Sequence, residues 1–160
     1  MSTRGTADLY DQYGEKLRVM APIFRDFGAR RAFAGAVLTL KVFEDNSLVR
    51  SHLEQAGNGR VLVVDGGGSM RCALVGDQLA KLGCDNGWAG IVIYGCVRDS
   101  PALAQMPIGI KALATNPRKS VKKGEGSVDI TLRFAEVSVT SNDYLYADAD
   151  GIVVADAQLP

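Results

Sequence analysis

The sequence predicts one α/β domain in which helices and strands pack as layers. Patterns typical of helices and of strands alternate from about residue 36 to residue 115, whereas the last third of the chain holds strand patterns alone. The longest apolar runs, such as Val61–Val64, have the length of buried strands. Because 160 residues are enough for one domain with a sizeable core, we assign residues 1–160 to a single domain.

Four segments are predicted to be helical from their capping residues and the spacing of their apolar residues. The first is Thr6–Tyr13, with Thr6 or Asp8 as the N-cap. The other three are a helix capped by Asn46–Ser47 that reaches Leu53, a helix over Ala73–Leu82 that ends at Gly83, and a helical turn that begins at Ser100–Pro101.

Runs of β-branched and apolar residues between turn-forming residues predict the strands. These are Ala36–Val42 after a turn at Ala32–Gly35, Val61–Val64, Gly90–Tyr94, Gly109–Ala114, a region around Val128–Phe134, and Val137–Val139. The segment Tyr144–Val154 is expected to form two short strands about an Asp-Gly turn.

The composition excludes several classes of function. Eighteen acidic residues balance eighteen basic ones, so no broad field attracts nucleic acid or an anionic membrane, and no apolar run has the length of a membrane span. The three cysteines are odd in number and none lies in a CxxC pattern. The N-terminus also lacks the apolar segment of a signal peptide, so we expect a cytoplasmic protein. The cysteine pattern argues against structural zinc. The short apolar runs and the balanced charge argue against a membrane anchor and against direct binding to nucleic acid.

Three further features each have a functional and a structural interpretation. The glycine loop Asp65–Ser69 follows a strand as a nucleotide-binding loop does, but it lacks the G-x-G-x-x-G spacing, and we favour a tight turn whose amides approach a ligand. His52 is the single histidine and has no nucleophile motif to serve, so we expect a surface or hydrogen-bonded side chain. The basic segment Asn116–Gly124 is a solvated loop, an anion-binding lid, or a contact for RNA or a protein.

The most informative pattern is a group of charged residues at a strand end. Arg98 and Asp99 directly follow an apolar strand, and Asp77 precedes Arg98 with twenty residues between them. That separation is about the length of a helix, a turn and a strand, so Asp77 can lie at the same end of the sheet as Arg98 and Asp99. α/β proteins usually bind ligands at this end of the sheet. Two carboxylates and one guanidinium there would suit a divalent cation and a small oxo-acid. The alternative is a surface ion pair that caps the next helix.

Longer motifs around these residues make the chain similar to a known family. The motifs are Val61–Gly66, Ala73–Asp77, Asn86–Gly90, Val92–Asp99, Gly109–Ala112, Thr115–Lys119 and Asp148–Val154. In their order and length they resemble the RraA family, and the resemblance extends from about Thr6 to the end of the chain.

The resemblance implies a fold and several functions. The fold is a swivelling β/β/α domain that forms a homotrimeric ring with active sites between neighbouring subunits. Some members are class II, metal-dependent aldolases that cleave 4-hydroxy-4-methyl-2-oxoglutarate to two pyruvates and also decarboxylate oxaloacetate, through a shared pyruvate enolate. One branch is a non-catalytic regulator that binds and inhibits ribonuclease E, and an RNA helicase is a further candidate partner. Other members have been labelled methyltransferases, which the glycine loop does not support.

The resemblance also implies a role for each charged residue. Asp99 is expected to ligate a divalent cation, Mg²⁺ or Mn²⁺, Asp77 to hold a water molecule on that metal, and Arg98 to clamp the carboxylate and oxo oxygen of the pyruvyl group. The backbone amides expected to bind the substrate carboxylate are those of Gly76, Asp77, Gln78 and Leu79. The presence of both acids favours catalysis over ribonuclease regulation, and no lysine Schiff base is expected.

Overall fold

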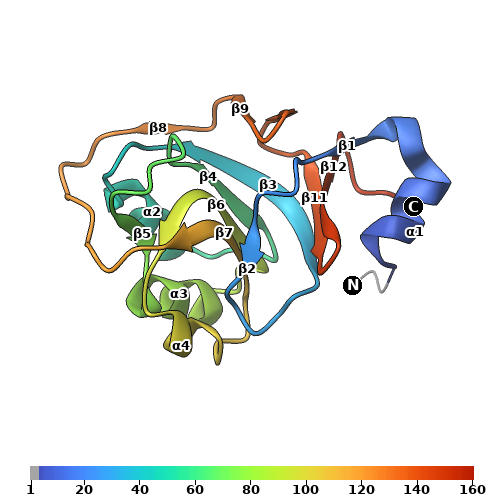
Figure 1. Ribbon diagram of the computed structural model, residues 1–160. Helices are drawn as coiled ribbons and strands as arrows, with labels where there is room; N and C mark the ends of the chain where they lie inside the picture. The colour runs from blue at the N-terminus through green and yellow to red at the C-terminus, as the bar shows by residue number, and fades with distance from the viewer. Residues whose placement is uncertain (1–3) are drawn as a thin grey trace.

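The computed structural model describes residues 4–160. At its centre lie four parallel strands: β3 (Phe33–Lys41), β4 (Val61–Asp65), β6 (Gly90–Val97) and β7 (Gly109–Thr115). They lie side by side in the order β3-β4-β6-β7 (Figure 1). Every residue of β4 is buried, because other elements cover both faces of this part of the sheet. That position explains why its sequence is a continuous apolar run without alternation.

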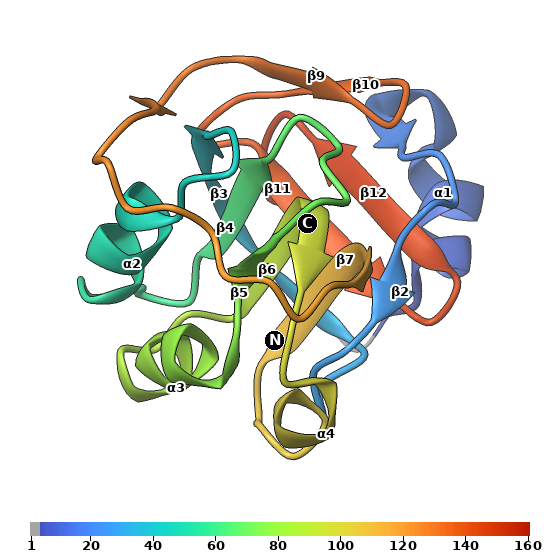
Figure 2. The same ribbon diagram turned by 60° about the vertical axis from the view of Figure 1, so that its left-hand side comes forward.

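Antiparallel strands extend the sheet at both sides. On the β3 side, β11 (Tyr144–Asp148), β12 (Gly151–Ala155) and β1 (Leu17–Val19) follow in that order, and β11 and β12 form the predicted hairpin. On the other side, β2 (Arg25–Asp26) pairs with β7. Figure 2 shows the hairpin next to the N-terminal helix α1 (Thr6–Tyr13), which is followed by the 3₁₀ turn η1 (Gly14–Lys16).

Four shorter strands complete the sheets. β5 (Ala73–Val75) pairs in parallel with the end of β6, and β8 (Ser127–Val128) pairs with β3. β9 (Leu132–Phe134) and β10 (Val137–Val139) form a separate hairpin. The single strand predicted around Val128–Phe134 is therefore two strands, because Asp129 adopts a left-handed conformation between them with a φ of 60°.

Helices cover one face of the sheet, and strands and loops cover the other. The helices α2 (Ser47–Leu53), α3 (Asp77–Asp85) and α4 (Ser100–Leu103) lie together beside β4, β6 and β7 (Figure 1), over a core that includes Leu53, Leu79 and Leu103. The opposite face packs against the β9–β10 and β11–β12 hairpins. This mixed α/β arrangement confirms the predicted layered fold.

The helix predicted over Ala73–Leu82 is wrong in both of its boundaries. Its first residues form β5, because Ala73 and Val75 pair with the end of β6. The helix begins at Asp77 and continues through Gly83 to Asp85. Gly83 does not end the helix; it lies within α3 against Ile108, whose Cδ1 would be 2.9 Å from an added Cβ.

Two other local predictions are also corrected. The turn predicted at Ala32–Gly35 is mostly strand, since β3 begins at Phe33. Neither Thr6 nor Asp8 caps α1: the N-cap is Gly5, and the Thr6 hydroxyl instead donates to the Asp148 carboxylate at 2.7 Å. That contact ties the start of the chain to the β11–β12 hairpin.

The structure confirms the expectation for His52 and shows the state of the cysteines. The three cysteines carry free thiols, and two of them are buried. His52 is partly buried, and its Nδ1 lies 2.7 Å from the carbonyl oxygen of Leu48, one helical turn earlier. Within residues 4–160, no helix is both long enough and apolar enough to cross a membrane.

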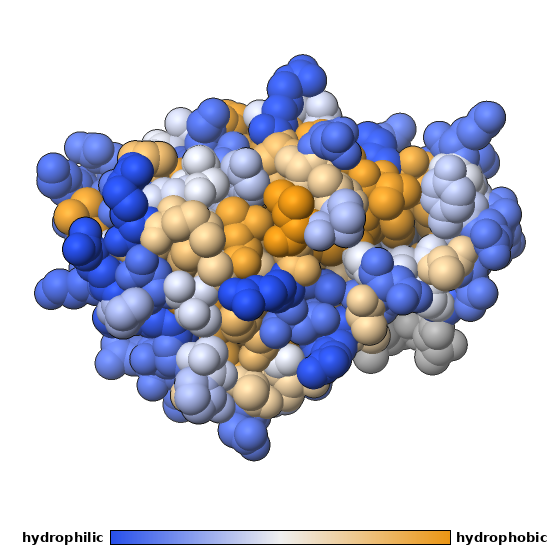
Figure 3. All heavy atoms as spheres, viewed as in Figure 1, coloured by the Kyte–Doolittle hydropathy of each residue, from blue (hydrophilic) through white to orange (hydrophobic). Residues whose placement is uncertain are grey.

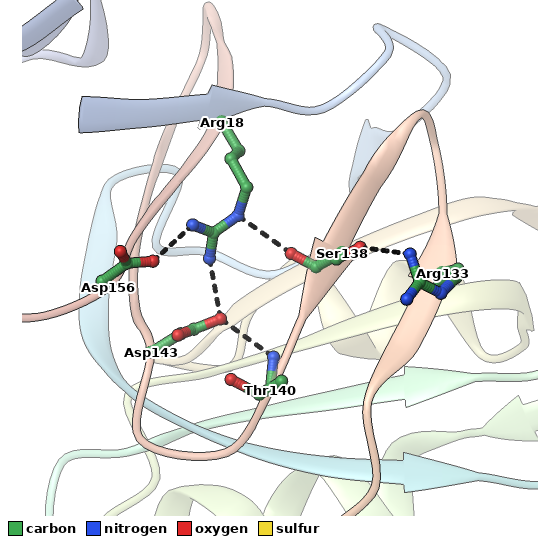
Figure 4. Close-up of polar contacts among 6 residues, drawn as sticks. All are labelled: Arg18, Arg133, Ser138, Thr140, Asp143 and Asp156. Carbon is green, nitrogen blue, oxygen red and sulfur yellow. Dashed lines mark hydrogen bonds and ion pairs between the residues drawn. The ribbon is translucent and has the colours of Figure 1, made fainter. Parts of the chain in front are cut away.

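A polar network joins the first strand to the loop that follows the β9–β10 hairpin (Figure 4). The Arg18 guanidinium donates to the carboxylates of Asp143 and Asp156 at 2.8 and 2.6 Å, and to the carbonyl oxygen of Ser138 at 3.0 Å. Asp143 also accepts the backbone N–H of Thr140 at 2.9 Å. Segments that lie more than 100 residues apart in the sequence are thereby held together, on the side of the molecule away from α2 and α3 (Figure 1).

The Phe33 ring lies against two glycines, Gly90 of β6 and Gly109 of β7, and this packing gives the first prediction. A side chain at Gly109 or at Gly90 would overlap the Phe33 ring. We expect Gly109→Ala to lower the free energy of unfolding by about 1–3 kcal/mol, the usual effect of overpacking a core. Urea denaturation measures this, with Gly95→Ala as control, because no atom would be closer to its Cβ than Cδ1 of the flexible Leu74 side chain at 3.3 Å. Equal stability of the Gly109 variant and the wild type would contradict the prediction.

Candidate active site

The predicted site residues come together at one small cavity beside α3. The cavity has a volume of about 160 Å³ and lies where β5 and β6 end and α3 and α4 begin. All six residues predicted for the site line it: Gly76, Asp77, Gln78, Leu79, Arg98 and Asp99. Its volume is below the range of roughly 300–1,000 Å³ typical of sites for drug-sized ligands, so it suits a small metabolite.

Gly76 allows the start of α3 to lie against Arg98 and Asp99, which follow β6. It joins β5 to α3 and lies against the side chains that follow β6. A Cβ at this position would be 2.6 Å from Oδ2 of Asp99 and 3.3 Å from Cγ of Arg98. Without a side chain there, the backbone N–H of Asp77 donates to Oδ2 of Asp99 at 3.0 Å. The two acids are therefore neighbours although 22 positions separate them.

Arg98 and Asp99 are placed by the backbone on either side of them. The Arg98 amide continues the pairing with β5 by donating to the Val75 carbonyl at 2.9 Å. Asp99 then adopts the left-handed conformation, with φ 60° and ψ 39°, and serves as the N-cap residue of α4. Aspartate tolerates this conformation better than most residues do. The turn directs the chain away from the sheet immediately after the two charged side chains.

The charged side chains of the site are open to the cavity. Asp99 is exposed, and Asp77 and Arg98 are partly buried. Within residues 4–160, neither acid forms an ion pair, and the Arg98 guanidinium has one long contact, 3.4 Å from Nη1 to the Pro117 carbonyl. The structure therefore does not contain the alternative, a surface ion pair between Arg98 and Asp99.

The donor set limits which metal ions this cavity could hold. Among the described residues, no group of three or more His, Cys, Asp or Glu side chains is placed to hold a metal. A metal at this site would have one or two carboxylates as protein ligands and would keep several waters. Mg²⁺ is commonly bound in that way, by hard oxygen ligands with part of its hydration retained. Zinc sites need more nitrogen or sulfur ligands than this cavity offers.

The sequence analysis missed a second set of residues at the same cavity. These are Asn46, Arg50, Ala73, Lys119, Ser120 and Lys122. The basic segment Asn116–Gly124 was the available signal, and the structure places part of it at the cavity, since Ala73 of β5 bridges to Lys119. Figure 2 shows this segment running from the end of β7 past β5 to the side of α2.

A buried carboxylate fixes this basic segment. Asp45 is 2 % exposed and accepts backbone N–H bonds from Lys123 at 2.8 Å and Glu125 at 3.2 Å, and its other oxygen accepts from the amide and hydroxyl of Ser47. Burial alone would raise the pKa of Asp45, but the hydrogen bonds from Ser47, Glu125 and Lys123 outweigh it and lower the pKa to about 2.

The glycine loop Asp65–Ser69 does not take part in the site. The backbone N–H groups of Gly66 and Gly68 both donate to the Tyr94 carbonyl, and that of Gly67 donates to the Asp65 carboxylate. The expectation that these amides approach a ligand is therefore wrong. They are used to fold the loop back onto β6.

Comparison with known proteins identifies the family of this chain. The model of a family described as "RraA-like: Aldolase/RraA" matches residues 6–154. The chain belongs to the RraA-like family. An RraA-like relative from Alkalilimnicola ehrlichii, provisionally named 4-hydroxy-4-methyl-2-oxoglutarate aldolase, is 62% identical over 150 residues, which are 94% of this chain and 93% of that protein. A relative from Aromatoleum aromaticum with the same provisional name is 56% identical over 96% of this chain and 97% of its own length.

Two solved RraA-like structures share the fold over nearly their whole lengths. One, from Geobacillus kaustophilus, is described as an S-adenosylmethionine:2-dimethylmenaquinone methyltransferase. It has a TM-score of 0.96 and 49% identity, over 98% of this chain and 97% of that one. The other is described as the RNA-processing inhibitor RraA from Thermus thermophilis. It has a TM-score of 0.95 and 48% identity, over 100% of this chain and 96% of that one.

The buried Asp45 carboxylate gives a prediction on pH. Its folded pKa of about 2 lies below the ordinary value of 3.8, so its contribution to stability is present above pH 3.8 and is lost as the pH falls toward 2. We expect Asp45→Asn to lower the free energy of unfolding at pH 7 by about 1–2 kcal/mol, with the difference from wild type narrowing between pH 4 and pH 2. Denaturant unfolding at several pH values measures this. A difference that does not change with pH would show that the carboxylate charge is not what holds the segment.

Proposed function

We propose that this protein is a metal-dependent class II pyruvate aldolase, a carbon-carbon lyase that cleaves 4-hydroxy-4-methyl-2-oxoglutarate to two pyruvates. The observation that supports this most is the meeting of Asp77, Arg98 and Asp99 at one cavity, with both acids free of ion pairs within residues 4–160. The provisional names of the relatives agree with it. Decarboxylation of oxaloacetate is the expected side activity, since both reactions leave the enolate of pyruvate.

The reaction needs stabilisation of negative charge on the 2-oxo oxygen of the substrate. Asp99 would hold a divalent cation, Mg²⁺ or Mn²⁺, which would stabilise this negative charge as a Lewis acid. Arg98 would bind the adjacent carboxylate and the oxo oxygen with its forked N–H groups, an arrangement that a lysine cannot reproduce. The amides of Gln78 and Leu79, in the first turn of α3, would bind the same carboxylate at the positive end of the helix.

The remaining acid has a separate task. The Asp77 carboxylate has no hydrogen-bond donor or ion-pair partner within residues 4–160, so it is available to orient a water molecule in the cavity. In aldol cleavage the bond between C3 and C4 breaks, the C4 hydroxyl loses its proton and becomes the oxo group of one pyruvate, and C3 of the other takes up a proton. We assign the water held by Asp77 as the carrier of these protons.

A ribonuclease regulator is the second candidate function. The structural similarity to the Thermus RNA-processing inhibitor favours it. The presence of both acids in an open cavity is a feature that such a regulator does not need. Co-purification with ribonuclease E or an RNA helicase, together with a ribonuclease inhibition assay, would support this function, and the two activities are compatible.

We also propose that the protein forms a homotrimer in the cytoplasm. An apolar area occupies the middle of the face in Figure 3 and is bordered by hydrophilic side chains. The segment from β1 to β2 contributes exposed apolar side chains, Val19 at 50% and Ile23 at 42% exposure. Exposed apolar surface of this kind is common where subunits meet. The three free thiols suit a reducing compartment.

Replacement of the expected metal ligand tests the proposed function. We expect Asp99→Ala to abolish metal-dependent release of pyruvate from 4-hydroxy-4-methyl-2-oxoglutarate, followed by coupling to lactate dehydrogenase. Asp85→Ala is the matched control, because Asp85 lies at the far end of α3 and pairs with Lys81 on the surface. Wild-type turnover in the Asp99 variant, with an unchanged fold by circular dichroism, would refute the assignment.

A conservative change at Arg98 tests the proposed clamp. Arg98→Lys keeps the charge but removes the forked donor geometry, and we expect kcat/KM to fall by roughly 30- to 1,000-fold, which is about 2–4 kcal/mol of transition-state stabilisation. Arg118→Lys, a neighbouring exposed arginine that does not line the cavity, serves as control. A loss below tenfold would count against bidentate binding by Arg98.

A further inference from the structure

A second cavity lies at the end of the sheet opposite to the candidate active site. The chain reaches it just before three of the parallel strands begin, with Arg30 before β3, Trp88 before β6 and Pro107 before β7. The candidate active site lies where β6 ends, and the two cavities share no lining residue. Since the eight residues of β6 span about 25 Å at roughly 3.3 Å per residue, the two cavities are separate.

Small residues open this second cavity, and aromatic residues line it. Four of its lining residues have at most a methyl side chain: Ala34, Gly59, Gly87 and Ala89. Tyr146 of β11 pairs with Ala34 of β3, so the space beside its ring is not filled by a long side chain. The ring of Tyr144 lies next to that of Tyr146, with 5.0 Å between the ring centroids. Trp88 is the third aromatic residue of the lining.

The cavity is large enough for a ligand with two fused rings. Its volume is about 540 Å³, within the range of roughly 300–1,000 Å³ that is typical of small-molecule sites. A cavity of about 150 Å³ in another protein is sufficient to bind benzene. A bicyclic ring that carries a polar substituent therefore fits in this space.

Two phenol groups of the cavity have hydrogen-bond donors to spare. Tyr146 is 4% exposed, and its hydroxyl oxygen accepts the backbone N–H of Leu159 at 2.8 Å. Its own proton has no acceptor within residues 4–160, and over the same residues the Tyr144 hydroxyl has no hydrogen-bond partner. Because a buried donor without an acceptor is unfavourable, these groups suit a ligand that brings acceptor oxygens.

One cation determines the charge of the ligand. Among the described residues that line the cavity, Arg30 carries the only charge, and it forms no ion pair within residues 4–160. Its side chain is exposed, while its backbone N–H is fixed by the Ile108 carbonyl at 3.3 Å. A guanidinium binds a carboxylate through two parallel N–H···O bonds, and an ionised carboxylate only accepts hydrogen bonds. The guanidinium and the two phenols thus suit the same group.

We propose that this cavity binds a planar aromatic carboxylate, with its ring against Trp88 and the two tyrosines and its carboxylate on Arg30. Aromatic walls favour an aromatic ring over a saturated one of similar size, since rings in offset or edge contact gain stabilisation beyond the area that they bury. The inference is independent of the proposed aldolase function, because no residue assigned to that chemistry lines this cavity. The exposed apolar residues proposed for subunit contact do not line it either.

The single tryptophan of the chain reports on this cavity directly. The indole N–H of Trp88 donates to the Gln55 carbonyl at 3.0 Å and gives one ¹H–¹⁵N NMR signal that needs no further assignment. Titration with 2-naphthoate should shift this signal saturably, because the ring current of a bound ligand acts locally. Two analogues test the chemical class. The amide 2-naphthamide lacks the charge and should bind about tenfold more weakly, and decahydro-2-naphthoate lacks the aromatic ring and should bind about 3- to 10-fold more weakly.

Two adjacent arginines separate the carboxylate contact from a general effect of charge. Arg30→Gln should raise the Kd of 2-naphthoate about tenfold, through loss of a charge-assisted hydrogen bond. Arg31→Gln is the matched control: Arg31 is exposed and does not line the cavity, so the Kd should stay at the wild-type value. Arg98→Gln, at the candidate active site, should also leave this Kd unchanged.

Four results would overturn the proposal. A Trp88 signal that millimolar 2-naphthoate does not move would show that the cavity is not a site for this class of ligand. Equal affinity for decahydro-2-naphthoate would refute recognition of the aromatic ring. The same Kd in the Arg30 and Arg31 variants would refute the contact with Arg30. A higher Kd in Arg98→Gln would place the ligand at the candidate active site instead.

Discussion

The close approach of two backbone segments at Gly76 is the constraint on which the candidate site depends. The amide of Asp77 donates to Oδ2 of Asp99 at 3.0 Å, and a Cβ on Gly76 would occupy space needed by that carboxylate. The bond joins the start of α3 to the end of β6 and brings both acids beside Arg98. It also leaves one oxygen of Asp99 and the whole Asp77 carboxylate for other ligands. A larger residue at position 76 would separate the groups that the proposed chemistry needs together.

The second feature of the site is that two buried residues hold its basic segment in place. Asp45 and Asn46, both buried at the start of α2, accept hydrogen bonds from the segment between β7 and β8. Two adjacent residues thus determine where Lys122 lies relative to α2 and β5. Cations placed in this way before a ligand arrives would favour an anion at that side of the cavity, opposite the acids to which the proposal assigns the metal and the oxo-acid.

The sequence allowed the fold class and the charged group to be predicted, because both depend on local patterns. Strand-length apolar runs gave β4, β6 and β7, and the spacing between Asp77 and Arg98 predicted their meeting. The predicted helix boundaries were wrong where tertiary contacts determine the local structure. Ala73–Val75 fits a helical pattern but pairs with β6, and Gly83 lies inside α3, where an added Cβ would be 2.9 Å from Cδ1 of Ile108. The position of Lys122 at the cavity depends on Asn46 and that of the amide after it on Asp45, both more than 70 residues earlier, so composition alone could not distinguish a lid from a solvated loop.

The central claim is that Asp77, Arg98 and Asp99 form a site that stabilises the enolate of pyruvate with the help of a divalent cation. Exchange of the pyruvate methyl protons with solvent deuterium, followed by NMR, reports enolate formation without any other substrate. The account predicts exchange by the wild-type protein in the presence of Mg²⁺ or Mn²⁺, loss of exchange with EDTA, and recovery when the metal is added back. Exchange at the uncatalysed rate with metal present, or protein-catalysed exchange that EDTA leaves unchanged, would contradict it.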